Sequence, residues 1–94
     1  MFSEKLLEAA ALIEKGWTTK ACARDKYGHP VDVSDKGAVR FCLIGALEAV
    51  GASRAERLKV KNLIRLQMFS HWNDYPGREK QEVVALLRRA AEVE

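Results

Sequence analysis

Residues 41–50 read FCLIGALEAV, and Glu48 is the only charged residue among them. A helix that is apolar on nearly every side is buried on nearly every side. The stretch therefore predicts a central helix over residues 36–50, with the other elements packed around it. Gly45 weakens such a helix relative to alanine, so we expect a neighbouring backbone to approach closely at this position.

Three further helices are predicted from apolar periodicity and from capping residues. Ser53 and Glu56 have the spacing of a capping box, and Gly16 stands where a left-handed C-cap is expected. The fold class is therefore mainly α, a compact four-helix domain formed by residues 1–94. The four predicted helices cover residues 3–15, 36–50, 53–70 and 78–93.

Residues 18–35 do not keep a helical period and are rich in turn residues. The sequence YGHP at residues 27–30 is typical of a tight turn. Extended pieces near residues 20–24 and 31–33 could pair on either side of it. We therefore expect a long ordered loop or a short β-hairpin between the first two helices, and loops of this length are often functional.

Composition excludes several classes of protein. The chain has 94 residues, 48% apolar and 31% charged, which fits one globular domain. Its formal net charge of +3 is too modest to imply a nucleic-acid partner by itself. The longest apolar run, residues 41–47, is far short of the roughly 20 residues of a membrane span, and glutamates interrupt the N-terminal apolar residues. We expect a cytoplasmic protein with reduced thiols, no membrane association and no cofactor.

Residues 71–74, which read HWND, place four chemically distinct side chains in one connection between helices. Arg40 falls inside the predicted central helix, where a buried guanidinium needs carboxylates or carbonyl oxygens around it. Asp25, Asp32 and Asp74 are the candidate partners. We therefore predict a polar cluster of Arg24, Asp25, Arg40, His71, Trp72, Asn73 and Asp74.

This cluster has a structural and a functional interpretation. In the structural one, Asp74 neutralises Arg40, Trp72 seals the core and Asn73 caps or turns the chain, which together pin the long loop to the helix junction. In the functional one, the cluster is a small polar pocket bordered by Trp72. His71 has no structural role in either, so it is the first place to look for a function.

The predicted third helix carries a basic stripe beside an apolar strip. The stripe consists of Arg54, Arg57, Lys61 and Arg65, and the strip consists of Val60, Ile64 and Met68. Leu58, Leu63, Leu66 and Phe69 are assigned to the core side. Apolar residues rimmed by cations favour a protein interface. The stripe could instead follow a phosphate backbone, although no aromatic residue interleaves it.

Cys42, His71 and Asp74 (or Asn73) supply the residue types of a cysteine-hydrolase triad. The same sequence argues against it, because Cys42 lies within the most apolar helix and is expected to be a buried core residue. No closely spaced cysteine pair seeds a metal site. A disulfide between Cys22 and Cys42 is not expected in a reducing compartment.

Several motifs in combination resemble a family of small bacterial and phage proteins catalogued only as a domain of unknown function. They are Trp17, ARDxxGxPVD at residues 23–32, AVRFCxxGAL at residues 38–47, WND at residues 72–74, and LLRRA at residues 86–90. The likeness covers most of the chain and is loosest in the third helix. It implies a compact, mainly helical domain in phage or mobile-element contexts, without an established activity.

The leading hypothesis is a non-enzymatic helical module that regulates a protein partner. The resemblance implies a phage or mobile-element accessory protein, such as an inhibitor of a host defence complex. A nucleic-acid-binding protein using the third helix and a hydrolase using Cys42 and His71 are the alternatives. The sequence leaves the oligomeric state open, with a homodimer as one option.

Overall fold

The computed structural model describes residues 3–93. Its elements follow in the order α1 (Glu4–Lys15), β1 (Ala23–Arg24), β2 (Pro30–Val31), β3 (Arg40–Phe41), α2 (Leu43–Ala49), α3 (Arg54–Leu63), α4 (Phe69–Asn73) and α5 (Lys80–Glu92). The mainly helical class is confirmed. The described chain forms five helices and a three-stranded sheet, however, and not the four-helix domain that was expected.

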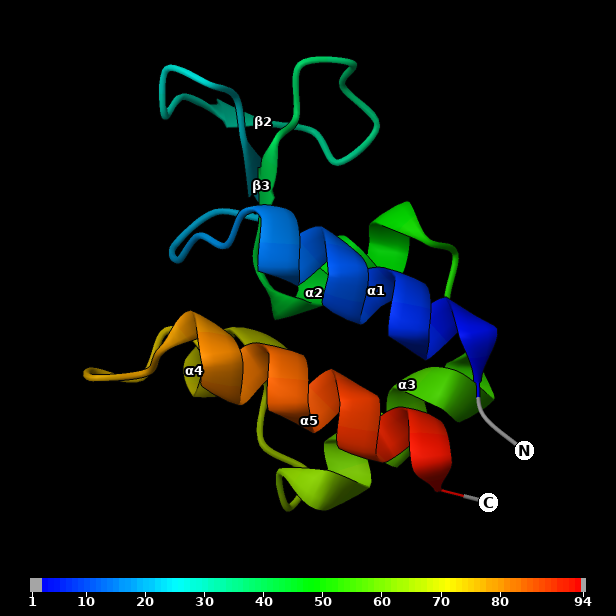
Figure 1. The fold of residues 1–94 in the computed structure, drawn as a ribbon. Coiled ribbons are helices and arrows are strands. Elements are labelled where there is room, and N and C mark those ends of the chain that lie inside the picture. The colour runs from blue at the N-terminus through cyan, green and yellow to red at the C-terminus, as the bar shows by residue number, and fades with distance from the viewer. Residues whose placement is uncertain (1–2, 94) are drawn as a thin grey trace.

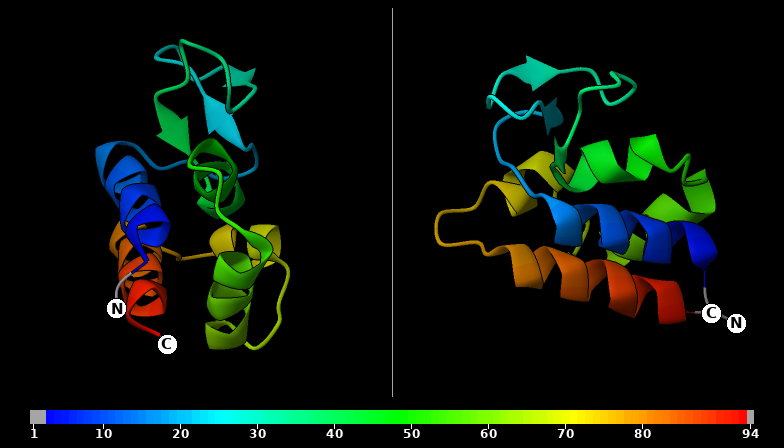
Figure 2. Two further views of the ribbon diagram at one scale, coloured as in Figure 1. Left: turned by 90° about the vertical axis from the view of Figure 1, so that its right-hand side faces the viewer. Right: turned by 45° about the horizontal axis from the view of Figure 1, so that its top comes forward.

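The helices form two layers, with the small sheet at one end (Figures 1 and 2). α1 and α5 lie side by side and run in opposite directions, and α2, α3 and α4 make the second layer. The Ser3 N–H donates to the Ala91 carbonyl oxygen over 2.9 Å, which joins the start of α1 to the end of α5. The largest fully buried apolar side chains are Leu6, Ile13, Leu43, Leu47, Val60, Val83, Val84 and Leu87.

None of the helices within residues 3–93 combines the length and apolar composition needed to cross a bilayer.

The predicted short hairpin is present between α1 and α2. β1 pairs with β2 in antiparallel register, with Ala23 opposite Val31, and Gly28 supplies the left-handed residue of the turn at φ 85°. A third strand, β3, pairs with the other edge of β1 and gives the strand order β2-β1-β3. This third strand was not predicted, because its partners are distant in sequence.

β3 also shortens the central helix, which begins at Leu43 and not at residue 36. The Phe41 N–H donates to the Gly16 carbonyl oxygen over 3.0 Å, and Arg40 lies opposite Arg24 in the sheet. These non-local bonds hold residues 40–41 extended. Cys42 then caps α2, since its Sγ accepts the Gly45 N–H over 3.3 Å.

The close backbone approach expected at Gly45 is confirmed. A Cβ added there would collide with the Cys22 carbonyl oxygen. Gly16, by contrast, is extended at φ −172°, so the left-handed C-cap predicted there is wrong. A Cβ at Gly16 would meet the Val39 carbonyl oxygen, which makes close approach the reason for this glycine too.

The predicted third helix is broken into α3 and α4. The capping box of Ser53 and Glu56 is confirmed, but α3 ends at Leu63. The Leu66 N–H donates to the Lys61 carbonyl oxygen over 2.8 Å, and the Arg65 N–H donates to that of Asn62 over 3.3 Å. These two bonds form a Schellman motif, which terminates a helix and usually carries glycine where Arg65 stands.

Candidate functional site

The amide of Asn73 lies at the centre of the molecule's main polar junction. This side chain is fully buried. Its Oδ1 accepts the Trp17 indole N–H over 2.8 Å and the Leu43 backbone N–H over 3.0 Å. Its Nδ2 donates to the Thr18 carbonyl oxygen over 3.1 Å and to Asp74 Oδ1 over 2.8 Å. One amide thus joins the end of α1, the loop after it, the start of α2 and the end of α4.

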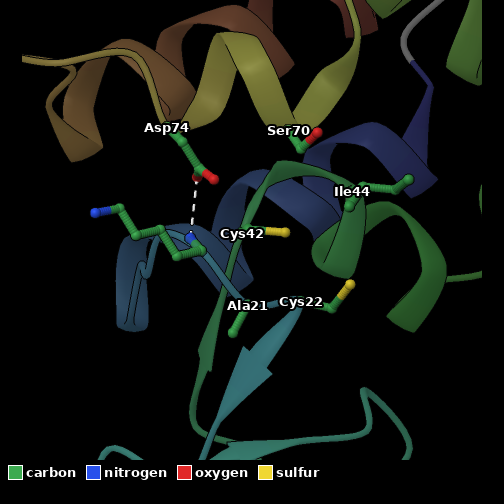
Figure 3. Close-up of a pocket in the computed structure, with 7 residues that line it drawn as sticks. Ala21, Cys22, Cys42, Ile44, Ser70 and Asp74 are labelled. Atoms are coloured by element: carbon green, nitrogen blue, oxygen red, sulfur yellow. Dashed lines mark hydrogen bonds between the residues drawn. The ribbon is translucent and has the colours of Figure 1, made fainter.

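Asp74 extends this junction to the loop. Its Oδ1 also accepts the Lys20 backbone N–H over 3.1 Å, the bond drawn as a dashed line in Figure 3. Lys20 itself is left-handed at φ 63°. The expected link between the long loop and the helix junction therefore exists, and Asn73 and Asp74 make it. We call these two residues the Asn73–Asp74 latch.

Arg40 does not belong to this latch. It is exposed on β3, so the expectation of a buried guanidinium neutralised by Asp74 is wrong. The error follows from the helix boundary: a residue in an edge region of the small sheet can turn its side chain to solvent, whereas the same residue in a buried helix could not. Asp74 accepts backbone and amide N–H groups in place of an arginine.

Arg24 and Asp25 form a separate group that organises the hairpin. The Arg24 guanidinium donates to Thr18 Oγ1 over 2.8 Å and to the carbonyl oxygens of Gly28 and Thr19. Asp25 Oδ1 accepts the N–H groups of Tyr27 and His29, each over 2.9 Å. The His29 N–H is the largest cause that lowers the pKa of Asp25. These bonds give both residues a structural role, and the predicted cluster is therefore not a single group.

Trp72 is packed against the core and covered by Arg78, a contact that the sequence did not predict. The guanidinium lies 3.8 Å from the centre of the Trp72 ring, and its Nε donates to the Trp72 carbonyl oxygen over 2.8 Å. Arg78 Nη1 also lies 3.1 Å from Glu82 Oε2. A cation over an aromatic face contributes about 0.5–1 kcal/mol at exposed sites. His71, one residue earlier in α4, is exposed, and its imidazole makes no hydrogen bond among residues 3–93.

Cys42 lacks the environment of a catalytic nucleophile. Its side chain is 5% exposed, and burial raises the pKa of the thiol to about 11, so very little reactive thiolate is present near neutral pH. It lines a cavity of about 280 Å³ together with Lys20, Ala21, Cys22, Ile44, Ser70 and Asp74 (Figure 3). His71 is not among these lining residues. Within residues 3–93, no three potential metal ligands lie close enough together to hold an ion.

The raised pKa of Cys42 predicts a loss of stability at alkaline pH. The unfolded thiol ionises near pH 9.0, whereas the folded thiol keeps its proton to about pH 11, so the folded state binds more protons in this window. Stability therefore falls as pH rises from 9 to 11, by about 2 kcal/mol for this group. Urea unfolding should show this extra loss in the wild type and in Cys22→Ser, but not in Cys42→Ser. Identical pH profiles for wild type and Cys42→Ser would contradict it.

Two of the three residues of the apolar strip predicted on the third helix face inward, and the third, Met68, is exposed. Val60 is fully buried and Ile64 is 3% exposed, so neither belongs to an accessible interface. Of the residues that were predicted to face the core, Phe69 is buried, whereas Leu58 is 53% and Leu66 is 65% exposed. Leu58 and Val60 both lie within α3, so the buried face of this helix was assigned wrongly. Only Leu66 and Met68 are displaced by the end of the helix at Leu63.

The basic stripe is also interrupted. The Arg57 Nε donates to the Ala52 carbonyl oxygen over 3.3 Å, and Lys61 Nζ lies 4.9 Å from the centre of the Phe69 ring. Arg54 and Arg65 remain exposed, but Arg65 lies beyond the helix. The stripe therefore does not present four free cations along one helical face.

The residues of α3 and of the connection to α4 include exposed large apolar side chains, among them Met68. Met68 is 58% exposed, and together with Leu58 and Leu66 it provides three of the seven large apolar side chains that stand out as exposed among residues 3–93. Arg54 and Arg65 are exposed near them in the chain. We call Arg54, Leu58, Arg65, Leu66 and Met68 the outer α3–α4 surface. No signal in the sequence located it, because Arg65 stands where a glycine would usually mark the end of the helix.

Comparison with known proteins gives a family for the chain. No curated protein and no solved structure matches it. The model of a family of unknown function, DUF6197, matches residues 2–93. That match spans nearly the whole sequence, and the chain therefore belongs to the DUF6197 family.

Proposed function

We propose that this protein is a non-enzymatic binding module that acts through a protein partner, and that the partner docks on the outer α3–α4 surface. The observation that carries the proposal is a pair of consecutive left-handed residues, Arg65 at φ 56° and Leu66 at φ 63°. Left-handed backbone is unfavourable by roughly 1–2 kcal/mol for a residue with a Cβ, and glycine removes that cost. Strained backbone of this kind is concentrated at functional sites. We infer that this backbone strain is kept because it presents the side chains of Arg65 and Leu66 to the partner.

The exposed side chains indicate the chemistry of the partner. Leu66 and Met68 are each more than half exposed, and an exposed Leu58 lies one helical turn from Arg54 on α3. Methionine and arginine are enriched at protein interfaces, and the buried centre of an interface is more apolar than the rest of the surface. The complementary surface would present an apolar centre with acidic residues around it, which also suits the net charge of +3.

The test is a quantitative pull-down from bacterial lysate with a matched pair of variants. Leu66→Asp combined with Met68→Asp should abolish capture of the stoichiometric partner while the melting temperature stays within about 4 °C of wild type, because both side chains are largely exposed. Leu7→Asp, on the exposed side of α1 at 40% exposure, is the control and should capture normally. Equal capture by the double variant would refute the proposal. Light scattering of the purified wild-type protein shows whether the same surface instead binds a second copy of the chain.

A nucleic-acid role has less support. It predicts binding that weakens steeply with salt and is lost on Arg57→Glu plus Lys61→Glu. Both of these cations already have partners within the chain. A cysteine hydrolase has less support still, because Cys42 is buried and His71 does not line its cavity. Thiol labelling of the native protein distinguishes it, since a hydrolase needs a fast-reacting Cys42.

The setting of the partner follows from the earlier resemblance to phage and mobile-element proteins. On that basis we propose a cytoplasmic module whose partner belongs to a bacterial host, with a defence complex as the leading class. Its support is the family context and the small size of the chain. Pull-downs from lysates with and without such a complex would test this narrower statement.

A further inference from the structure

We propose that Cys22 and Cys42 form an oxidation site, in which a low-molecular-weight disulfide of the glutathione class converts the two thiols into a protein disulfide. Both cysteines are free in the resting structure. This inference is independent of the outer α3–α4 surface and does not rest on it.

The backbone already places the two cysteines opposite each other. β1 and β3 pair with Ala23 opposite Phe41, so one step along the antiparallel register sets Cys22 opposite Cys42. The Cys42 N–H donates to the Cys22 carbonyl oxygen over 3.0 Å, which continues the pairing to this position. Directly opposed residues have Cα atoms about 4.5–5.5 Å apart, and disulfides span about 4.4–6.8 Å. The bond therefore requires side-chain rotation without movement of the strands.

The two thiols also share one cavity with unequal access. Both line the cavity of about 280 Å³, and Figure 3 shows both sulfur atoms on the side of Ile44. Cys22 is exposed, whereas Cys42 is 5% exposed. An oxidant from solution therefore meets Cys22 first, and Cys42 is placed to act second.

The reaction balances in two exchange steps. The Cys22 thiolate attacks one sulfur of oxidised glutathione, forms a mixed disulfide and releases one reduced glutathione. The Cys42 thiolate then attacks the Cys22 sulfur of the mixed disulfide, forms the Cys22–Cys42 bond and releases the second glutathione. The protein loses two electrons and two protons, and one glutathione disulfide is reduced to two thiols.

The second step is restrained by the contacts that Cys42 makes. Its Sγ must leave the Gly45 N–H, so the cap of α2 is given up when the disulfide forms. Burial raises the pKa of Cys42 and the Asp74 carboxylate raises it further, whereas the hydrogen bond from the Gly45 N–H lowers it. Lys20 is the other charged residue that lines the cavity. The rate of the second step should therefore rise about tenfold for each pH unit between 7 and 9, because the thiolate fraction does.

Native protein incubated with oxidised glutathione, quenched in acid and alkylated, tests this by mass spectrometry of tryptic peptides. We expect the mixed disulfide on Cys22 to appear first and to be replaced by a cross-link between peptides 21–24 and 41–54. The replacement should be faster at pH 9 than at pH 7. Cys42→Ser should stop at the mixed disulfide, and Cys22→Ser should react far more slowly than the wild type.

Three results would overturn the proposal. Cys42 could carry glutathione before Cys22, the mixed disulfide on Cys22 could persist at pH 9 in the wild type, or only cross-links between separate molecules could form. A melting curve of each variant before oxidation checks that the exposed thiol reacts on folded protein. If Cys42→Ser does not fold, Cys42→Ala takes its place in the same comparison.

Discussion

Gly45→Ala is expected to destabilise the protein by about 3 kcal/mol, although alanine is the better helix former. The added Cβ would collide with the Cys22 carbonyl oxygen, a backbone atom held by its hydrogen bond from Cys42. Overpacking usually costs about 1–3 kcal/mol, and a rigid backbone neighbour gives the upper end. Helix propensity alone would instead stabilise the variant by about 1 kcal/mol. Urea unfolding at neutral pH therefore decides between two effects of opposite sign.

A second glycine provides the control for this experiment. Gly28 is left-handed at φ 85°, and nothing lies within 4 Å of a Cβ placed there. Gly28→Ala should lower stability by only about 1 kcal/mol, from backbone strain. If Gly45→Ala were as stable as the wild type, the close contact between α2 and the Cys22 segment would be wrong.

Asn73→Ala is expected to cost about 4 kcal/mol. The change would leave the Trp17 indole N–H, the Leu43 N–H and the Thr18 carbonyl oxygen without their partner at a fully buried position. Each buried polar group left unpaired costs about 1–3 kcal/mol, and water entering the space recovers part of the sum. For a chain of this size, such a loss should lower the melting temperature by more than about 15 °C.

Asn73→Asp separates the acceptor role of this side chain from its donor role. One carboxylate oxygen can still accept from Trp17 and Leu43, but the other would face the Thr18 carbonyl oxygen and the Asp74 carboxylate. Both neighbours and burial raise the folded-state pKa of the introduced carboxyl group. Its protonated form is therefore favoured on folding, and the deficit relative to wild type should shrink as pH falls from 7 towards 4. A deficit that grows at low pH would contradict this arrangement of the latch.

Local signals account for the features that could be predicted from the sequence. The apolar run at residues 41–50 and the isolated Gly45 correctly indicated burial and close backbone approach. Ser53 and Glu56 form their capping box from neighbouring residues alone. The turn residues of the long loop likewise indicated a hairpin, which β1 and β2 form.

Non-local pairing explains what the sequence did not reveal. β3 exists because Arg40 and Phe41 pair with residues far away in the chain, and this pairing removes Arg40 from the helix. The role of Asn73 depends on hydrogen bonds to Trp17, Thr18 and Leu43, which are distant in the sequence. The residues next to Asn73 in the chain give no sign of these partners. The end of α3 carries Arg65 in place of the usual glycine, so the helical period continued past the true end.

The most direct test of the proposed function is to remove the strain and measure partner capture. Arg65→Gly combined with Leu66→Gly should raise stability by about 1–2 kcal/mol, because both positions are left-handed. It also deletes two side chains of the outer α3–α4 surface. Lys20→Gly is the matched control, since Lys20 is left-handed at φ 63° but lies in the loop after α1.

We predict that the Arg65→Gly, Leu66→Gly protein is more stable than the wild type yet no longer captures the stoichiometric partner, whereas Lys20→Gly captures it normally. Stability and binding would then change in opposite directions at the same two residues. Capture of the partner by the double-glycine protein at the wild-type level would contradict the proposed function.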